Sequence, residues 1–161
     1  MMREHAVSPV VGTMLLITVT IVIAAAVALA ASSLSQASEQ PPAVELAVTT
    51  YGDYNNFTLI FEHRGGEILN PENIRVTTKM SSPDGYYLSN NSMLSNFTAG
   101  YWQAGQTIQL NKTRIAECMN ISTDILNTSI NRSRPAEFLF VYLPTSSVLA
   151  DVSVLLTAGA N

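Results

Sequence analysis

The sequence predicts an α+β protein, in which one long hydrophobic helix near the N-terminus precedes an antiparallel β-sandwich. Three features of the 161 residues support this prediction. Val10 to Ala31 form an apolar run without a charge, Pro41–Pro42 interrupt the chain, and apolar and polar residues alternate from Val44 onward. Strict alternation is typical of strands with one buried face, whereas the earlier run has no such period. The sequence therefore divides into a helical segment and a β-rich domain.

The apolar run is long enough to cross a membrane. No Asp, Glu, Lys or Arg occurs between Glu4 and Glu39, and residues 10–31 would span about 33 Å as a helix. Such a run can be a removable export signal, a permanent anchor or the central helix of a filament subunit. Ala28–Leu29–Ala30 supplies a site for cleavage after Ala30, but the length of the run and its weakly cationic start oppose a removable signal. Arg3 before the run and acidic residues after it favour a domain on the outer side.

The β-rich domain is expected to cover residues 43–161, because Pro41–Pro42 end any helix that continues to residue 40. Gly65–Gly66 and Ser82–Pro83–Asp84–Gly85 are expected to form turns. The segment 111–135 is expected to be a loop insertion with one or two helical turns, because its many Asn and Ser residues disfavour a long helix. Strands are expected near residues 44–48, 57–62, 74–77, 108–110, 138–143 and 148–157.

Composition argues against several classes of function. A net charge of −4 leaves no basic field for nucleic acid. The single cysteine, Cys118, excludes an internal disulfide and is expected to be a small apolar residue. His63 is expected to be structural, and the sequence contains no motif for a nucleophile, a metal or a phosphate. We therefore expect a protein that is not an enzyme and needs no cofactor.

Acceptor triplets for N-glycans are unusually frequent. Chance would give about two Asn-x-Ser/Thr triplets from the 12 Asn and 31 Ser or Thr of this chain. Seven are present, none with proline in the middle, at Asn56, Asn90, Asn96, Asn111, Asn120, Asn127 and Asn131. Because N-glycans are bulky and solubilising, the sequence predicts a glycan coat on one side of the domain, carried by segments expected to be loops.

The residues before the apolar run carry the most specific signal. Charge at Arg3–Glu4–His5 stands directly before the string Ser8–Pro9–Val10–Val11–Gly12, and a helix rich in Leu, Met, Val, Ile, Thr and Ala follows. This arrangement closely resembles the N-terminus of euryarchaeal type IV pilins, which carry a class III prepilin signal. The resemblance implies a prepilin leader at residues 1–6. It also implies that a membrane prepilin peptidase cuts on the cytoplasmic side near His5, Ala6 or Val7, so that residues 7–40 are retained.

The resemblance also implies what the retained helix does. It would lie in the membrane first, and then polymerise with copies of itself in an extracellular pilus, served by an assembly ATPase and a membrane platform protein. The outer domain would be an immunoglobulin-like or pilin-like sandwich that serves adhesion and surface attachment. The small residues of the helix permit close packing between helices. The residues expected in the filament core are Ser8, Pro9, Val10, Val11, Gly12, Leu15, Leu16, Ile17, Ile21, Ile23, Ala26 and Leu29.

A second interpretation stays open at the level of the sequence. The chain could be a monomeric cell-surface binding domain, held by a plain membrane anchor or secreted after cleavage of a signal. The N-terminal residue of the mature protein separates the two. A start near Ala6 or Val7 indicates a pilin, whereas a start at Ala31 or an intact Met1 indicates the alternative.

Overall fold

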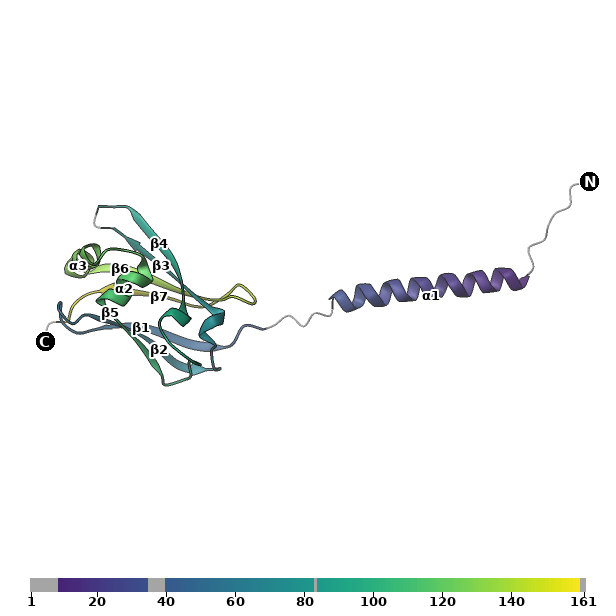
Figure 1. Cartoon of the computed structure of the whole chain (residues 1–161), viewed down its shortest axis with the longest axis horizontal. Coiled ribbons are helices and arrows are strands. Elements are labelled where there is room, and N and C mark those ends of the chain that lie inside the picture. Colours follow the sequence, from purple (N-terminus) through teal and green to yellow (C-terminus); the bar gives the residue numbers. More distant parts are fainter. Residues whose placement is uncertain (1–8, 35–39, 83, 160–161) are drawn as a thin grey trace, which may run out of the picture. The chain divides into compact units, whose positions relative to one another are not determined.

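The structure is a computed structural model that describes residues 9–34, 40–82 and 84–159. The chain divides into two compact units, Met1–Ser38 and Glu39–Asn161 (Figure 1). The predicted leader, residues 1–6, lies outside the described residues. The helix-then-sheet order confirms the predicted α+β class.

The described part of the first unit is helix α1 (Pro9–Leu34). Proline is well tolerated at a first helical position, because the N–H group that it lacks has no partner there. The hydroxyls of Thr13, Thr18 and Thr20 donate to main-chain carbonyls three or four residues earlier, at 2.8–2.9 Å. These polar side chains are therefore satisfied within the helix, and α1 presents apolar groups on all sides.

The second unit consists of two antiparallel sheets. The first sheet has the order β1-β2-β5 and the second has the order β4-β3-β6-β7. The first sheet contains β1 (Val44–Tyr51), β2 (Thr58–Gly66) and β5 (Thr107–Asn111). The second contains β3 (Ile74–Ser81), β4 (Tyr87–Met93), β6 (Arg134–Tyr142) and β7 (Ser147–Leu156). Two short 3-10 helices, η1 (Pro71–Asn73) and η2 (Leu94–Asn96), join strands.

Aromatic side chains join the two sheets at the centre of the core. The ring of Phe61 on β2 makes edge contacts with Phe138 and Phe140 on β6, with ring centroids 5.6 and 5.2 Å apart. All three side chains are fully buried. Perpendicular arrangements of this kind are favoured by the charge distribution of aromatic rings. The alternation in the sequence thus places one face of each strand in a shared core.

The predicted turn at Gly65–Gly66 is wrong. Gly65–Gly66 are the last two residues of β2 rather than a turn, and Gly66 pairs with Val44 on β1. Gly66 has a φ of +103°, and a Cβ atom there would overlap the carbonyl oxygen of Ala43. Glycine is therefore required for the strands to approach each other at this end of the sheet.

The segment 111–135 forms two helices, which corrects the expectation of a loop insertion. They are α2 (Lys112–Met119) and α3 (Thr123–Asn131). The side chains of Asn111 and Ser122 cap the two N-termini by accepting from main-chain N–H groups. Both helices bury apolar side chains, including Ile115 and Leu126. Tertiary burial and capping therefore outweigh the weak helix propensity of Asn and Ser.

Helix α2 covers one edge of the sandwich. It contacts β4, the edge strand of the second sheet, and also β5, the edge strand of the first. At the opposite edge, β1 and β7 contact each other directly. We call the side covered by α2 the α2 edge. Because α2 bridges the two sheets there, it completes the core where the sheets would otherwise lie open.

The thiol of Cys118 on α2 is expected to be inert in the folded protein. Its side chain is fully buried, and burial raises the pKa of the thiol to about 12. A neutral, inaccessible thiol does not attack disulfide reagents. We expect no reaction with Ellman's reagent at mildly alkaline pH until denaturant is added, followed by release of one equivalent. Fast labelling without denaturant would show that α2 opens readily.

Candidate assembly helix and sequon surface

Helix α1 exposes nearly all of its apolar surface. Val10–Ala30 is long and apolar enough to cross a membrane, and none of this span is buried within the chain. Figure 1 shows α1 as one continuous helix. An apolar helix exposed on all sides in water is unfavourable, so lipid or other helices must surround it. The structure therefore assigns α1 as the part of the chain that requires an apolar environment.

Most of the residues predicted for the filament core lie on α1. Those from Pro9 onward lie on the helix, and Ser8, together with the processing residues His5, Ala6 and Val7, lies outside the described residues. The following predicted residues are exposed on α1: Val10, Val11, Gly12, Leu15, Leu16, Ile17, Ile21, Ile23, Ala26 and Leu29. Because these residues occur on every side of the helix, a single neighbour could not cover them all.

Most of the seven Asn-x-Ser/Thr sequons lie near α2, although they span positions 56 to 131. Asn111 caps the N-terminus of α2 and Asn120 is at its C-terminus, in a left-handed conformation. Asn127 on α3 accepts from the Lys112 ammonium at 2.9 Å, and the main-chain oxygen of Asn96 accepts from Arg114 at 2.8 Å. The cap and the hydrogen bonds place sequons from several elements at the α2 edge.

Two of the remaining three sequons, Asn90 and Asn56, lie beside the same edge. Asn90 on β4 donates to the main-chain oxygen of Cys118 in α2, and Asn131 is the last residue of α3. Asn56 precedes β2, whose residue Thr58 pairs with Asn111. That all seven sequons lie on one side of the domain stays a prediction. The prediction that they lie in loops is wrong for several, because Asn90 is in a strand and Asn127 is in a helix.

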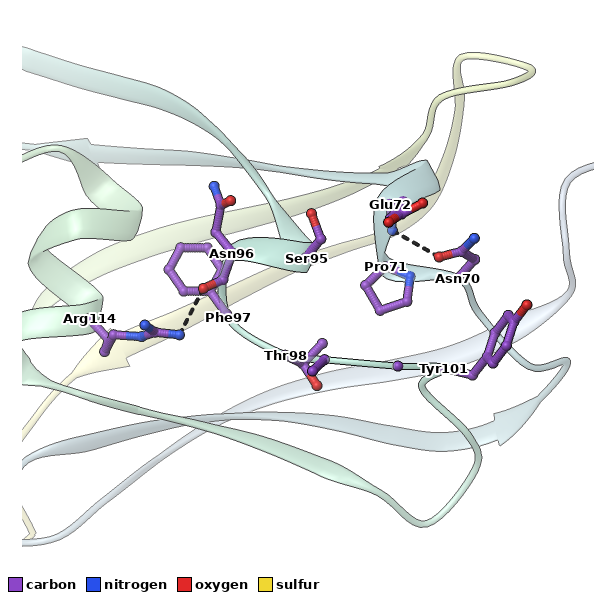
Figure 2. Close-up of a pocket in the computed structure, with 11 residues that line it drawn as sticks. Asn70, Pro71, Glu72, Ser95, Asn96, Phe97, Thr98, Tyr101 and Arg114 are labelled. Atoms are coloured by element: carbon purple, nitrogen blue, oxygen red, sulfur yellow. Dashed lines mark hydrogen bonds between the residues drawn. The ribbon is translucent and has the colours of Figure 1, made fainter.

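A groove runs beside the N-terminal turn of α2 (Figure 2). It has a volume of about 650 Å³ and is lined by η1, η2, the segment 97–101 and Arg114. Arg114 lies 5.4 Å from the centre of the Phe97 ring, and Tyr101 is exposed at the other end of the segment. The lining mixes one carboxylate, Glu72, with one guanidinium and several neutral polar groups. This composition gives the groove no strong charge of either sign.

Residues that often carry catalysis have structural positions here. His63 is buried beside Trp102, with ring centroids 5.3 Å apart, and its Nε2 lies 2.9 Å from the carbonyl oxygen of Glu67. Over residues 9–34, 40–82 and 84–159, His, Cys, Asp and Glu form no group of three that could hold a metal. The hydroxyl of Thr49 and the guanidinium of Arg64 donate to Glu62, and these bonds lower the pKa of that carboxyl. Glu62 is therefore part of a surface network.

The helix and the sheets together define the class of protein. It is a protein with one N-terminal helix that can enter a membrane and one antiparallel β domain after it. Residues 5–46 match the family of archaeal type IV pilin N-terminal domains. This match confirms the resemblance and supports a pilin subunit, a structural class that self-assembles into filaments. No curated protein matches the chain.

Proposed function

We propose that this chain is the subunit of an extracellular archaeal type IV pilus. The observation that carries the proposal is α1, a helix within the matched segment 5–46 whose apolar surface is covered by nothing in the described chain. In the membrane, lipid covers that surface, and in a filament, neighbouring copies of α1 cover it. The same helix thus serves first as an anchor and then as the polymer core.

Assembly requires a cut before the helix. A membrane prepilin peptidase removes residues 1–6 near His5, Ala6 or Val7 and leaves α1 on the mature chain. An assembly ATPase and a membrane platform protein supply the work of extracting the helix from lipid. Subunits then join in a head-to-tail contact that does not close on itself, which generates a fibre rather than a ring.

The β domain, residues 43–161, is displayed on the filament surface and serves adhesion. Exposed aromatic side chains support this role, because aromatic rings with a polar tip are frequent at recognition surfaces. The side chains of Tyr51, Tyr86, Tyr87 and Tyr101 are 66–73% exposed. The alternative, a monomeric membrane-anchored or secreted binding domain, would display the same surface but would leave α1 without partner helices.

The N-terminal residue of the mature chain tests the proposed function. We expect protein sheared from the cell surface to begin near Ala6 or Val7, because the peptidase cuts before the apolar run. Edman sequencing or mass spectrometry of the intact subunit gives this residue. The cell membrane fraction is the matched control and should contain the same processed chain before assembly. A chain that begins at Ala31, or that keeps Met1, would contradict the pilin and support the monomeric alternative.

A further inference from the structure

The seven sequons differ in the hydrogen bonds that their asparagine side-chain amides make in the fold. An N-glycan is attached to Nδ2, and the carbonyl oxygen Oδ1 and one N–H remain available afterwards. A sequon can therefore keep a hydrogen bond to Oδ1 when it is glycosylated, but not two hydrogen bonds from Nδ2. We infer that Asn90 remains unglycosylated because its Nδ2 joins β4 to α2, and that the other six asparagines accept the glycans, most of which then lie along the α2 edge.

Asn90 uses its Nδ2 to join β4 to α2. Nδ2 donates to the carbonyl oxygen of Cys118 at 2.8 Å and to Oγ of Ser92 at 3.1 Å. The Ser92 hydroxyl donates to the same carbonyl at 3.1 Å. This carbonyl belongs to the last turn of α2, where main-chain oxygens have no partner within the helix. Two side chains of β4 thus satisfy it, and a sugar on Nδ2 would have to displace α2.

At two other sequons, the asparagine side chain forms its hydrogen bond through Oδ1 alone. Oδ1 of Asn111 accepts from the main-chain N–H of Arg114 at 3.0 Å, and Oδ1 of Asn127 accepts from the Lys112 ammonium at 2.9 Å. Both bonds survive when a sugar replaces one hydrogen of Nδ2. The helix cap at Asn111 and the tie between α2 and α3 are therefore compatible with glycosylation.

The four remaining sequons present exposed side chains. Figure 2 shows why Asn96 is available: Arg114 binds its main-chain oxygen, while its side-chain amide points away from that contact. Asn56, Asn120 and Asn131 are exposed at the ends of elements. Within the described part of the chain, no hydrogen bond involves Nδ2 of any sequon other than Asn90. The six acceptors thus share a free Nδ2.

The transfer itself needs a lipid-linked sugar as the donor. Nδ2 attacks the anomeric carbon of a sugar carried on a polyprenyl phosphate, and a carbon–nitrogen bond forms as the bond from carbon to phosphate oxygen breaks. The amide loses one proton, and the lipid phosphate leaves with the bonding electrons. This inference rests on the proposed function, because an outer domain anchored by α1 meets such a donor at the membrane surface.

Glycopeptide mapping tests the assignment on the full chain from its native host. We expect sugar on most of the six acceptors and a bare peptide at Asn90. A glycan on Asn90, or bare peptide at half or more of the six, would overturn the inference. The readout does not depend on filaments. It therefore separates this inference from the proposed function, which is tested by the N-terminal residue.

A pair of matched variants tests the structural role of Asn90. Asn90→Asp and Asn56→Asp each abolish one sequon with a nearly isosteric side chain. We expect Asn90→Asp to leave the glycan mass unchanged and to raise the unfolding equilibrium constant about tenfold or more, because a carboxylate cannot donate to the Cys118 carbonyl. Asn56→Asp should remove one glycan with no comparable shift. Urea unfolding of the detergent-solubilised full chain, followed by the fluorescence of Trp102, gives the constant. An Asn90→Asp chain as stable as the wild type would contradict a stabilising role of the Asn90 hydrogen bonds between β4 and α2.

Discussion

Replacing Ile21 with lysine is expected to abolish filament formation while leaving the β domain folded. Ile21 lies near the middle of the span Val10–Ala30, and its side chain is 63% exposed on α1. A lysine at the centre of a membrane helix costs about 2.5–3.5 kcal/mol in insertion. The same charge would be unpaired in a core of apolar helices, because no acidic residue occurs between Glu4 and Glu39. Both the membrane stage and the filament stage are therefore disfavoured.

The measurement is the amount of subunit in sheared surface filaments relative to whole cells, by immunoblot. Ile21→Leu is the matched control, because it keeps the volume and the apolar character, and it should assemble normally. Trp102 fluorescence of the detergent-solubilised variant checks that the β domain is folded. Wild-type filament yield from Ile21→Lys would refute the assignment of α1 as the polymer core.

The elements with strong periodicity could be predicted from the sequence. The apolar run predicted α1, and alternation or short apolar runs located six of the seven described strands. The missed strand is β4, whose sequence from Tyr87 to Met93 is mostly polar. It is an edge strand that contacts α2 through polar side chains, so its apolar signal is weak. Its pairing with β3 depends on tertiary contacts that no local pattern contains.

The candidate site could be predicted only in part. The sequence indicated that α1 can span a membrane, since membrane-length apolarity is visible in a single segment. It also identified the seven sequons, but it could not separate Asn90 from Asn56. That difference depends on the Cys118 carbonyl, 28 residues further along the chain, which folding brings to 2.8 Å from Nδ2. A hydrogen bond between residues so far apart in the sequence forms only because α2 packs on β4.

Replacing Phe61 with alanine is expected to destabilise the β domain by about 3–5 kcal/mol, because it removes a large buried ring and leaves a cavity. The ring of Phe61 is fully buried and contacts rings of the opposite sheet at Phe138 and Phe140. Domains are commonly stable by only about 5–15 kcal/mol, so this loss is a large share of the total. Phe61→Leu, which keeps most of the volume, should lose much less.

The measurement is urea unfolding of the full chain in detergent, followed by the fluorescence of Trp102, the only tryptophan. Trp102 is 1% exposed, so its emission changes when the core opens. Tyr87→Ala is the surface control, because this side chain is 66% exposed, and it should change stability by less than about 0.5 kcal/mol. Equal unfolding midpoints for Phe61→Ala and Tyr87→Ala would contradict a core centred on the Phe61 contacts.

The Phe61 variant also separates folding from anchoring. Because α1 belongs to a different compact unit, Phe61→Ala should still enter the membrane and be processed at its N-terminus. Its β domain would unfold more often and be degraded, which lowers the yield of filaments through the supply of subunits. Ile21→Lys should give the reverse pattern, with a folded domain and failed assembly. A Phe61→Ala chain that is missing from the membrane even when proteolysis is blocked would show that insertion of α1 depends on the fold of the β domain.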